Sequence, residues 1–330
     1  MVPERGAPVL VTGASGFLGS HLVERLVGRG IPVRCLVRES SNLTWLPRER
    51  VDLVYGEITR PESLEAAVAG VTRVFHLAGL TEAKDEARYL SVNATGTANL
   101  VRALTRRRQR PERFVLVSSL AAGGPSRSGR PRLETDPDTP AGAYGRSKLA
   151  GERALAGADF PWTVLRPPAV YGPRDRDFPK LFRLVRRGWS PRLTGPPQEL
   201  SLVHVLDLVE GIAAAAESPA AVGRIFYLAH PEVVTWPEVA RLAAEALGRP
   251  DRSFPLPRGC LLPLARGVGL IAALAGRPNP FPPDRVRDLL APAWTCDPSA
   301  AAEAFGFRPK CGLRIGIPAT VAWCREAGVV

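Results

Sequence analysis

The sequence predicts an α/β protein whose main part is a doubly wound parallel sheet, followed by a smaller C-terminal region. Three observations predict this class. An apolar run, Val9 to Val11, breaks into a glycine-spaced turn and continues as an amphipathic helix. Further short apolar runs alternate with helical patterns through the first half of the chain. A tyrosine and a lysine four residues apart open a later helix, after the fifth of these runs.

Composition limits the function classes. The 330 residues are 45% hydrophobic, which is enough for a large core. Five scattered cysteines form no C-x-x-C pair, so we expect no metal site and no disulfide framework, and a reducing cytoplasm fits best. The first eight residues carry no apolar segment typical of a signal peptide. The net charge of +12 raises the question of nucleic acid, but the arginines are spread out and no aromatic residues interleave with them. We expect no nucleic-acid partner.

The first strand and helix enclose a turn suited to a dinucleotide pyrophosphate. Gly13 permits the tight turn, Gly16 lets the main chain approach an anion, and Gly19 lets the helix pack on the strand. The helix N-terminus adds free N–H groups and a positive dipole end. The alternative is a tight turn with no ligand. The expected contacts of the cofactor here are Gly13, Ser15, Gly16, Phe17, Leu18 and Gly19.

The next two strands bear on the adenosine half of the cofactor. Residues 31–37 predict a second strand that ends in Arg38, with no carboxylate in the position that binds a ribose 2′-hydroxyl. An arginine there pairs with a 2′-phosphate, so NADP is favoured, while the adjacent Glu39 keeps NAD as the alternative. A third strand over 51–55 leads to Glu57 and Ile58, which we expect over the adenine; a loop with a helix cap is the other interpretation.

Two further strands bring polar groups to the same sheet edge. A fourth strand over 71–77 ends in Leu77, Ala78 and Gly79, whose small size lets the backbone lie close to a ligand, while His76 is expected to be buried. A helix over 86–106 contains Asn93 and a glycine, which both lower helix propensity, so we expect Asn93 to be a buried amide that ties the site together. A fifth strand over 114–117 delivers Ser119 at its carboxyl end.

Tyr144 and Lys148 carry the candidate chemistry. Their spacing places both side chains on one face of a helix, one turn apart. A phenol titrates near ~10 in water, and a neighbouring ammonium favours the phenolate. We therefore expect Lys148 to lower the pKa of Tyr144 toward the range useful for acid–base catalysis, with Ser119 holding the same substrate oxygen.

These motifs together resemble the extended short-chain dehydrogenase/reductase family, which includes nucleotide-sugar epimerases and dehydratases, dihydroflavonol reductases and 3β-hydroxysteroid dehydrogenases. The resemblance covers nearly the whole chain, in order. The matching segments are Thr12-Gly13-x-x-Gly16-x-x-Gly19, His76-Leu77-Ala78-Gly79, Asn93-x-x-Gly96-Thr97, Ser119, Tyr144-x-x-x-Lys148 and Arg166-Pro167-x-x-Val170-Tyr171-Gly172-Pro173.

The resemblance implies a seven-stranded Rossmann sheet, a smaller C-terminal substrate domain and hydride transfer at a nicotinamide. It implies Tyr144 as the acid–base group, Lys148 as the group that lowers its pKa and binds the nicotinamide ribose, and Ser119 as the group that orients the substrate. Pro167 and Val170 would line the nicotinamide pocket. The implied domains are 1–166 with 203–229 for the cofactor and 167–202 with 230–330 for the substrate.

One departure from the family bears on the substrate. Nucleotide-sugar members commonly carry an arginine just before the segment that corresponds to 202–207, and here Glu199 stands in that region. A carboxylate facing a diphosphate is unfavourable, so a largely apolar substrate (sterol-, terpenoid- or flavonoid-like) is favoured. Arg174 keeps open an anionic substrate, as in an epimerase or dehydratase with retained cofactor. A third hypothesis is a non-catalytic NADP-binding sensor or subunit. The presence of Ser119, Tyr144 and Lys148 argues against it.

The C-terminal half changes composition. Helices are expected over 179–187, 204–217, 236–247 and 297–305, with a strand over 224–228, a Pro/Gly-rich loop over 190–198 and proline-rich loops elsewhere. The most apolar window, 260–275, is short for a membrane span and predicts a buried or pocket-lining helix; a peripheral membrane contact is the alternative. A homodimer through the helices over 86–106 and 143–156 is a further open prediction.

Overall fold

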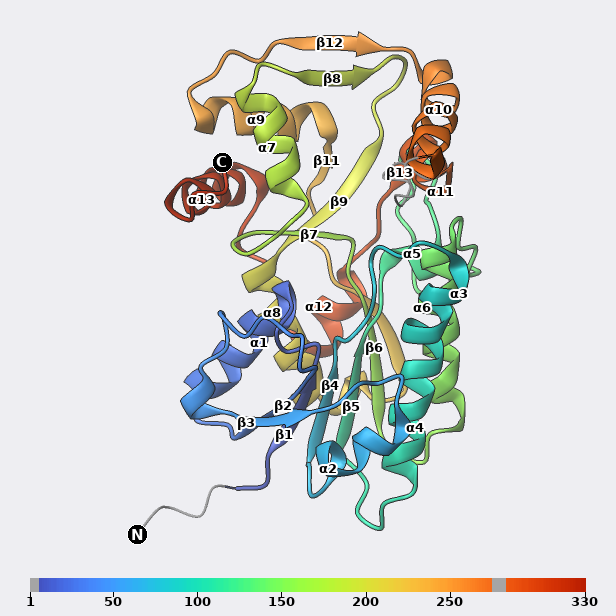
Figure 1. Cartoon of the computed structure of the whole chain (residues 1–330), viewed down its shortest axis with the longest axis vertical. Helices are drawn as coiled ribbons and strands as arrows, with labels where there is room; N and C mark the ends of the chain where they lie inside the picture. Colours follow the sequence, from blue (N-terminus) through green and yellow to red (C-terminus); the bar gives the residue numbers. More distant parts are fainter. Residues whose placement is uncertain (1–5, 275–282) are drawn as a thin grey trace.

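The computed structural model describes residues 6–274 and 283–330, and it places a seven-stranded sheet at the centre of one half of the molecule (Figure 1). All seven strands run parallel, in the order β10-β6-β5-β4-β1-β2-β3. The strands are β1 (Val9–Thr12), β2 (Val33–Val37), β3 (Asp52–Tyr55), β4 (Arg73–His76), β5 (Arg113–Val117), β6 (Trp162–Arg166) and β10 (Arg224–Tyr227). The strand order reverses between β1 and β4, and parallel sheets place ligands outside the carboxyl ends of the strands at such a point.

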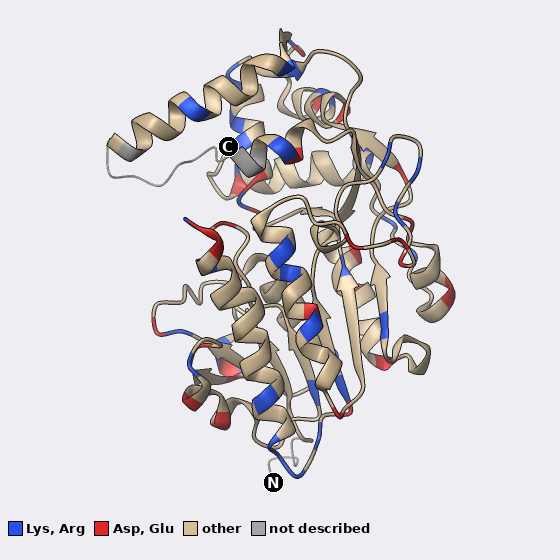
Figure 2. Cartoon of the chain, turned by 90° about the vertical axis from the view of Figure 1, so that its right-hand side faces the viewer, with Lys and Arg blue, Asp and Glu red and all other residues tan. Residues whose placement is uncertain are grey.

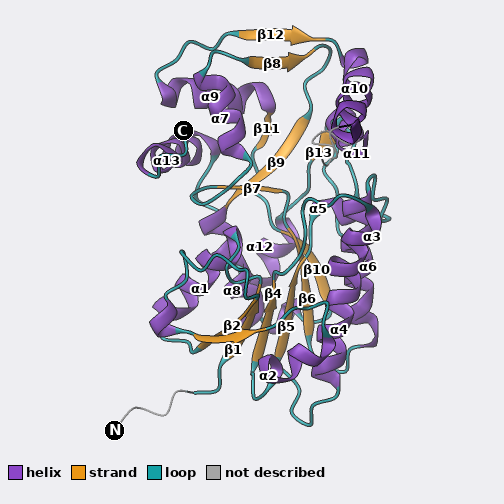
Figure 3. Cartoon of the chain, viewed as in Figure 1, coloured by secondary structure: helices purple, strands orange, loops and turns teal. Residues whose placement is uncertain are grey.

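Helices cover both faces of the sheet, which confirms the doubly wound Rossmann architecture (Figure 3). On one face α1 (Phe17–Gly28) packs against α8 (Val205–Glu217), and α12 (Ser299–Phe305) lies near β10. Their core contains Leu22, Leu26, Leu208 and Ile212, all buried. The elements on the other face are α2 (Glu65–Val68), α3 (Glu86–Tyr89), α4 (Gly96–Thr105) and α6 (Ala143–Arg153), with the short α5 (Leu120–Gly123) above the sheet edge.

The helix expected over 86–106 is interrupted at its middle. Residues Leu90–Thr95 form a π-helical segment between α3 and α4, and Asn93 is its buried residue. Such wide turns inside a helix concentrate at functional sites. The packing also explains the neighbouring glycine, because a Cβ on Gly96 would lie 2.8 Å from the Ile58 side chain.

A second, smaller group of elements stands over the carboxyl ends of the strands (Figure 1). Its sheet joins β9 to β7, β11 and β13, and α7, α9 and α13 pack together beside it. The elements are β7 (Ala169–Tyr171), α7 (Phe178–Arg186), β9 (Glu199–His204), β11 (Val233–Thr235), α9 (Trp236–Leu247), β13 (Ala293–Trp294) and α13 (Leu313–Glu326).

Two sequence predictions are wrong in this upper region. The segment expected to be a Pro/Gly-rich loop contains the strand β8 (Ser190–Leu193), which pairs with β12 (Ser253–Leu256). Tertiary pairing outweighs the local proline signal here, because proline is tolerated at sheet edges. The window over 260–275 contains α10 (Leu261–Leu274), followed by α11 (Pro283–Leu290), but α10 is largely exposed and not buried. No helix in the described ranges is long and apolar enough to span a membrane.

Candidate functional site

The glycine turn after β1 has the geometry that its sequence predicts. Gly13 has a φ of 72°, and a Cβ there would lie 2.7 Å from the amide nitrogen of Ala78. A Cβ on Gly19 would overlap the carbonyl oxygen of Gly13, so that glycine lets α1 close onto the turn. Gly16 is exposed, and α1 has no side-chain cap. The uncapped N–H groups and the exposed glycine fit a dinucleotide pyrophosphate.

The structure brings most of the predicted cofactor residues to this one edge of the sheet. Ser15, Phe17 and Leu18 are partly buried in the turn and first helical turn. Leu77, Ala78 and Gly79 follow β4, and Pro167 and Val170 follow β6. Arg38 and Glu57 stand after β2 and β3, with Arg38 exposed. The side chain of Ile58 is 7% exposed and belongs to the core, so its contact with adenine stays a prediction.

A chain of buried hydrogen bonds connects the glycine turn with the helix that carries Tyr144. Thr12 Oγ1 lies 2.6 Å from His76 Nδ1, and His76 Nε2 lies 2.9 Å from Thr97 Oγ1. Thr97 donates to the carbonyl oxygen of Asn93 at 2.7 Å.

Asn93 carries this chain onward to α6. Its Nδ2 donates to Ser147 Oγ at 2.9 Å, and Ser147 donates to the carbonyl oxygen of Tyr144 at 2.7 Å. Asn93 Oδ1 accepts from the amide of Leu80 at 2.7 Å, and Nδ2 also donates to the Leu80 carbonyl at 3.0 Å. The amide therefore ties the loop after β4 to α6, as the sequence predicts. His76 is fully buried, also as predicted.

Ser119 and Tyr144 meet above the carboxyl end of β5. The hydroxyl of Ser119 lies beside the Tyr144 phenol, and it accepts from the amide of Ala121 at 3.1 Å, which fixes its direction. The ring of Tyr144 packs against Tyr89 with centroids 5.9 Å apart. Lys148, one turn further along α6, is buried and donates to the carbonyl of Val117 at 2.8 Å.

The expected lowering of the Tyr144 pKa does not appear in the structure. Burial raises the pKa of Tyr144 above its ordinary value, and the hydrogen bond with Ser119 opposes this shift. Burial also lowers the pKa of Lys148 to about 8, against the attraction of Glu152. The phenol is thus protonated near neutral pH. A protonated phenol beside a serine hydroxyl is a donor pair for a substrate oxygen.

Lys148 also reaches the loop after β4. A Cβ built on Gly79 would lie 3.7 Å from Lys148 Nζ and 3.0 Å from Asn93 Oδ1. The ammonium of Lys148 and the amide oxygen of Asn93 therefore both lie close to Gly79, in the loop that follows β4. These residues fit a nicotinamide cofactor that extends along the carboxyl edge from the turn to Tyr144.

Sequence reasoning missed an ionic cluster beneath α6. Arg166, 1% exposed, binds Glu152 at 2.5 Å and Asp138 at 2.6 Å. Glu152 also accepts a hydrogen bond from Ser118. A detectable signal existed, because Lys148 and Glu152 are four residues apart and so share a helix face. Nothing in the sequence pairs that face with Arg166 at the end of β6.

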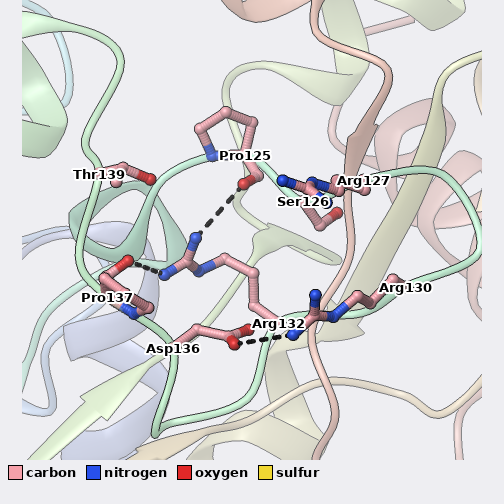
Figure 4. Close-up of a pocket in the computed structure, with 8 residues that line it drawn as sticks. All are labelled: Pro125, Ser126, Arg127, Arg130, Arg132, Asp136, Pro137 and Thr139. Carbon is pink, nitrogen blue, oxygen red and sulfur yellow. Dashed lines mark hydrogen bonds and ion pairs between the residues drawn. The ribbon is translucent and has the colours of Figure 1, made fainter.

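A cavity of about 260 Å³ lies within the loop that joins Ser119 to Tyr144 (Figure 4). The loop leaves α5 at Gly124 and returns at Gly142 before α6. Arg132 is 7% exposed in this cavity and donates to the carbonyl of Pro137 at 2.6 Å. Arg130 pairs with Asp136 at 3.4 Å. The lining residues are Pro125, Ser126, Arg127, Arg130, Arg132, Asp136, Pro137 and Thr139.

Two residues singled out for substrate recognition have structural partners. Arg174 pairs with Glu24 at 2.7 Å and stacks on Trp45 at 4.7 Å, so its guanidinium has partners within the chain, and its contact with an anionic substrate group stays a prediction. Glu199 binds Ser128 and accepts from the amide of Gly129 at 2.9 Å, which lowers its pKa. The carboxylate therefore holds the loop over the cavity.

Comparison with known proteins agrees with this geometry. The model of the NAD dependent epimerase/dehydratase family matches residues 9–229, which is more than half of the chain. The chain belongs to the NAD-dependent epimerase/dehydratase family. It is an oxidoreductase-type enzyme of the extended short-chain dehydrogenase/reductase group.

Individual relatives cover most or all of the chain. It is similar to a ceramide reductase of Caulobacter vibrioides, with 33% identity over 99% of this chain and 98% of that protein. A 3 beta-hydroxysteroid dehydrogenase/Delta 5-->4-isomerase of Mycobacterium tuberculosis is 34% identical over 73% of this chain and 70% of that protein. The structure of Thermus thermophilus UDP-glucose 4-epimerase in complex with NAD superposes with a TM-score of 0.79 at 27% identity, over 97% and 99% of the two chains.

We predict that His76 makes the protein sensitive to acid. Burial lowers the pKa of His76 from 6.5 to about 3, so the unfolded chain binds a proton between these values that the folded chain does not bind. The free energy of unfolding should therefore fall as the pH drops from 6.5 toward 3. Urea unfolding at a series of pH values should show a flatter acid limb for His76→Gln.

The control is His230→Gln, because His230 is only partly buried and is not a member of the buried hydrogen-bond chain. It should reproduce the acid limb of the unmodified protein. An acid limb that is equally steep in His76→Gln would contradict the assignment.

Proposed function

We propose that this enzyme interconverts a secondary alcohol and a ketone, with NADP as the favoured cofactor and a largely apolar substrate of the sterol, terpenoid or flavonoid kind. The observation that carries the proposal is the placement of Ser119 beside the Tyr144 phenol, with Lys148 buried one helical turn away along α6. Residues 1–166 with 203–229 would bind the cofactor, and 167–202 with 230–330 the substrate. The five cysteines are free thiols, which supports a cytoplasmic setting.

The acid–base role follows from the protonation state of the site. A carbonyl oxygen bound by Ser119 and Tyr144 accepts two hydrogen bonds, and the phenol transfers its proton as negative charge develops on that oxygen. The raised pKa of Tyr144 keeps the phenol protonated, so it carries the proton that reduction of a ketone needs. A bound nicotinamide supplies or accepts the hydride. Lys148, Gly79 and Asn93 would hold its ribose end.

The partners of Arg174 and Glu199 support an apolar substrate. Arg174 is already paired with Glu24. Glu199, which stands in the region where nucleotide-sugar members carry an arginine, holds the loop at Ser128 and Gly129 and supplies no cation there. Relatives over most of the chain are named for a ceramide and a hydroxysteroid. A substrate of similar chemistry suits these residues.

A nucleotide-sugar epimerase or dehydratase with retained cofactor is the second candidate. The cavity lined by Arg127, Arg130 and Arg132 favours it, because guanidinium groups recognise phosphates. The similarity to the UDP-glucose 4-epimerase structure points the same way. Release of oxidised cofactor in each turnover separates the two, since an epimerase shows no net redox change.

We predict that Tyr144→Phe abolishes turnover. The substitution removes only the hydroxyl that donates the proton, so turnover of a ketone panel, followed by NADPH oxidation, should fall at least about 100-fold. NADPH affinity should stay nearly unchanged. Tyr89→Phe is the matched control, since its ring contacts Tyr144 but its hydroxyl donates to the Thr81 carbonyl at 3.1 Å. Unreduced activity in Tyr144→Phe would overturn the assignment.

We predict that Arg38 selects NADPH. Its guanidinium would pair with the 2′-phosphate, so Arg38→Ala should weaken NADPH binding by about tenfold or more, with little change for NADH. Fluorescence titration with both cofactors measures this difference. Arg107→Ala, which removes another exposed arginine beyond the end of α4, should change neither affinity. Tighter binding of NADH than of NADPH by the unmodified protein would show that NAD is the cofactor.

A further inference from the structure

The helix α10 presents large apolar side chains to solvent. Leu270, Ile271 and Leu274 are 64%, 68% and 82% exposed, and Leu264 is 50% exposed. At 100° per residue these four positions lie on one side of the helix, which we name the outer face. Arg266 is the one charged residue of α10. Figure 2 shows α10 standing out from the body, as the helix that runs into the grey trace.

The opposite side of α10 attaches the helix to the protein. Leu261 and Ala265 are buried there and pack with Val286 of α11 and with Leu193 and Leu256, the last residues of β8 and β12. The helix therefore already packs on the protein through its other side, and the outer face is a separate, solvent-exposed apolar surface. A surface helix of a globular protein normally has the reverse pattern, with polar residues outward.

An aromatic pair is exposed at the same end of the molecule, on the strands that support α10 (Figure 1). Trp189 precedes β8 and is 59% exposed, and Phe254 lies on β12 and is 36% exposed. Their rings contact each other edge to face, with centroids 5.6 Å apart. Exposed aromatic rings of this kind are enriched where proteins meet the interface of a bilayer.

Arginines are frequent in the two segments that carry the aromatic pair and α10. Residues 183–197 contain four arginines and no acidic residue, and residues 248–274 contain four arginines and one aspartate. Among them Arg187, Arg192, Arg252 and Arg266 are exposed. Cations beside an apolar helix face attract anionic lipid headgroups.

We propose that the outer face of α10 and the Trp189–Phe254 pair form a surface that docks onto an anionic lipid bilayer, where the enzyme meets its apolar ketone. The apolar ketone rests on the proposed function, whereas the docking does not depend on it. With 14 residues, α10 is too short to cross a bilayer, which needs ~20, so it would lie in the interface plane.

A second copy of the chain is a poorer occupant of this surface. A two-fold interface would bring the same patch of each copy together. The arginines of residues 183–197 and 248–274 would then face one another with one aspartate per copy to offset them. Like charges across an interface oppose association, whereas anionic lipid neutralises them.

Vesicle flotation without cofactor or ketone tests the docking. The full chain should float with vesicles of phosphatidylcholine mixed with phosphatidylglycerol, less with phosphatidylcholine alone, and less as salt is raised. The double substitution Leu270→Gln/Ile271→Gln should reduce binding at least about tenfold. Leu206→Gln/Ile315→Gln, which removes two apolar side chains of similar exposure elsewhere, should leave it unchanged.

Three results would overturn the proposal. These are failure of the full chain to float with either vesicle, an equal loss in the control, and a dimer in solution that Leu270→Gln/Ile271→Gln dissociates. NADPH oxidation with a short, water-soluble ketone should be the same in both double variants. That measurement needs no vesicle, so a failure of the proposed function is distinguishable from a failure of docking.

Discussion

The buried hydrogen-bond chain from Thr12 to Tyr144 is the constraint on which the site depends. It runs from β1 through His76, Thr97, Asn93 and Ser147 to the backbone of α6, and so crosses the sheet at its carboxyl edge. Each buried polar group in it needs its partner, because an unsatisfied group costs about 1–3 kcal/mol. The glycine turn and the backbone of α6 at Tyr144 are therefore held in one fixed relation. The π-helical turn around Asn93 is the local deformation that lets its side chain reach both neighbours.

The charge of Lys148 depends on the ionic groups beneath α6. Lys148 is buried, and burial alone disfavours its charge. Glu152, four residues on, offsets part of this penalty, and Glu152 is in turn neutralised by Arg166, which also holds Asp138. The ammonium near Gly79 is thus maintained by the ionic groups beneath α6. Burial raises the pKa of Tyr144, which leaves the phenol protonated near neutral pH.

The sequence predicts the lower half of the molecule well because its signals are local. The glycine positions, the strand ends, Asn93 and the Tyr144–Lys148 spacing all follow from periodicity and backbone sterics, and the strands of the large sheet appear close to the predicted ranges. The errors involve long-range partners. No residue near Ser190 indicates the pairing with β12, and the apolar pattern of α10 does not indicate which side of the helix is buried. The direction of the Tyr144 shift also failed, because depth of burial is a property of the packed site.

A double-substitution cycle on turnover tests the central claim most directly. Asn93→Ala and Ser147→Ala remove adjacent members of the hydrogen-bond chain, and neither removes the phenol or the ammonium. If the chain positions Tyr144 as one unit, the double variant should turn over no more slowly than the slower single variant, since residues in one network are not additive. Losses that multiply in the double variant would contradict the account.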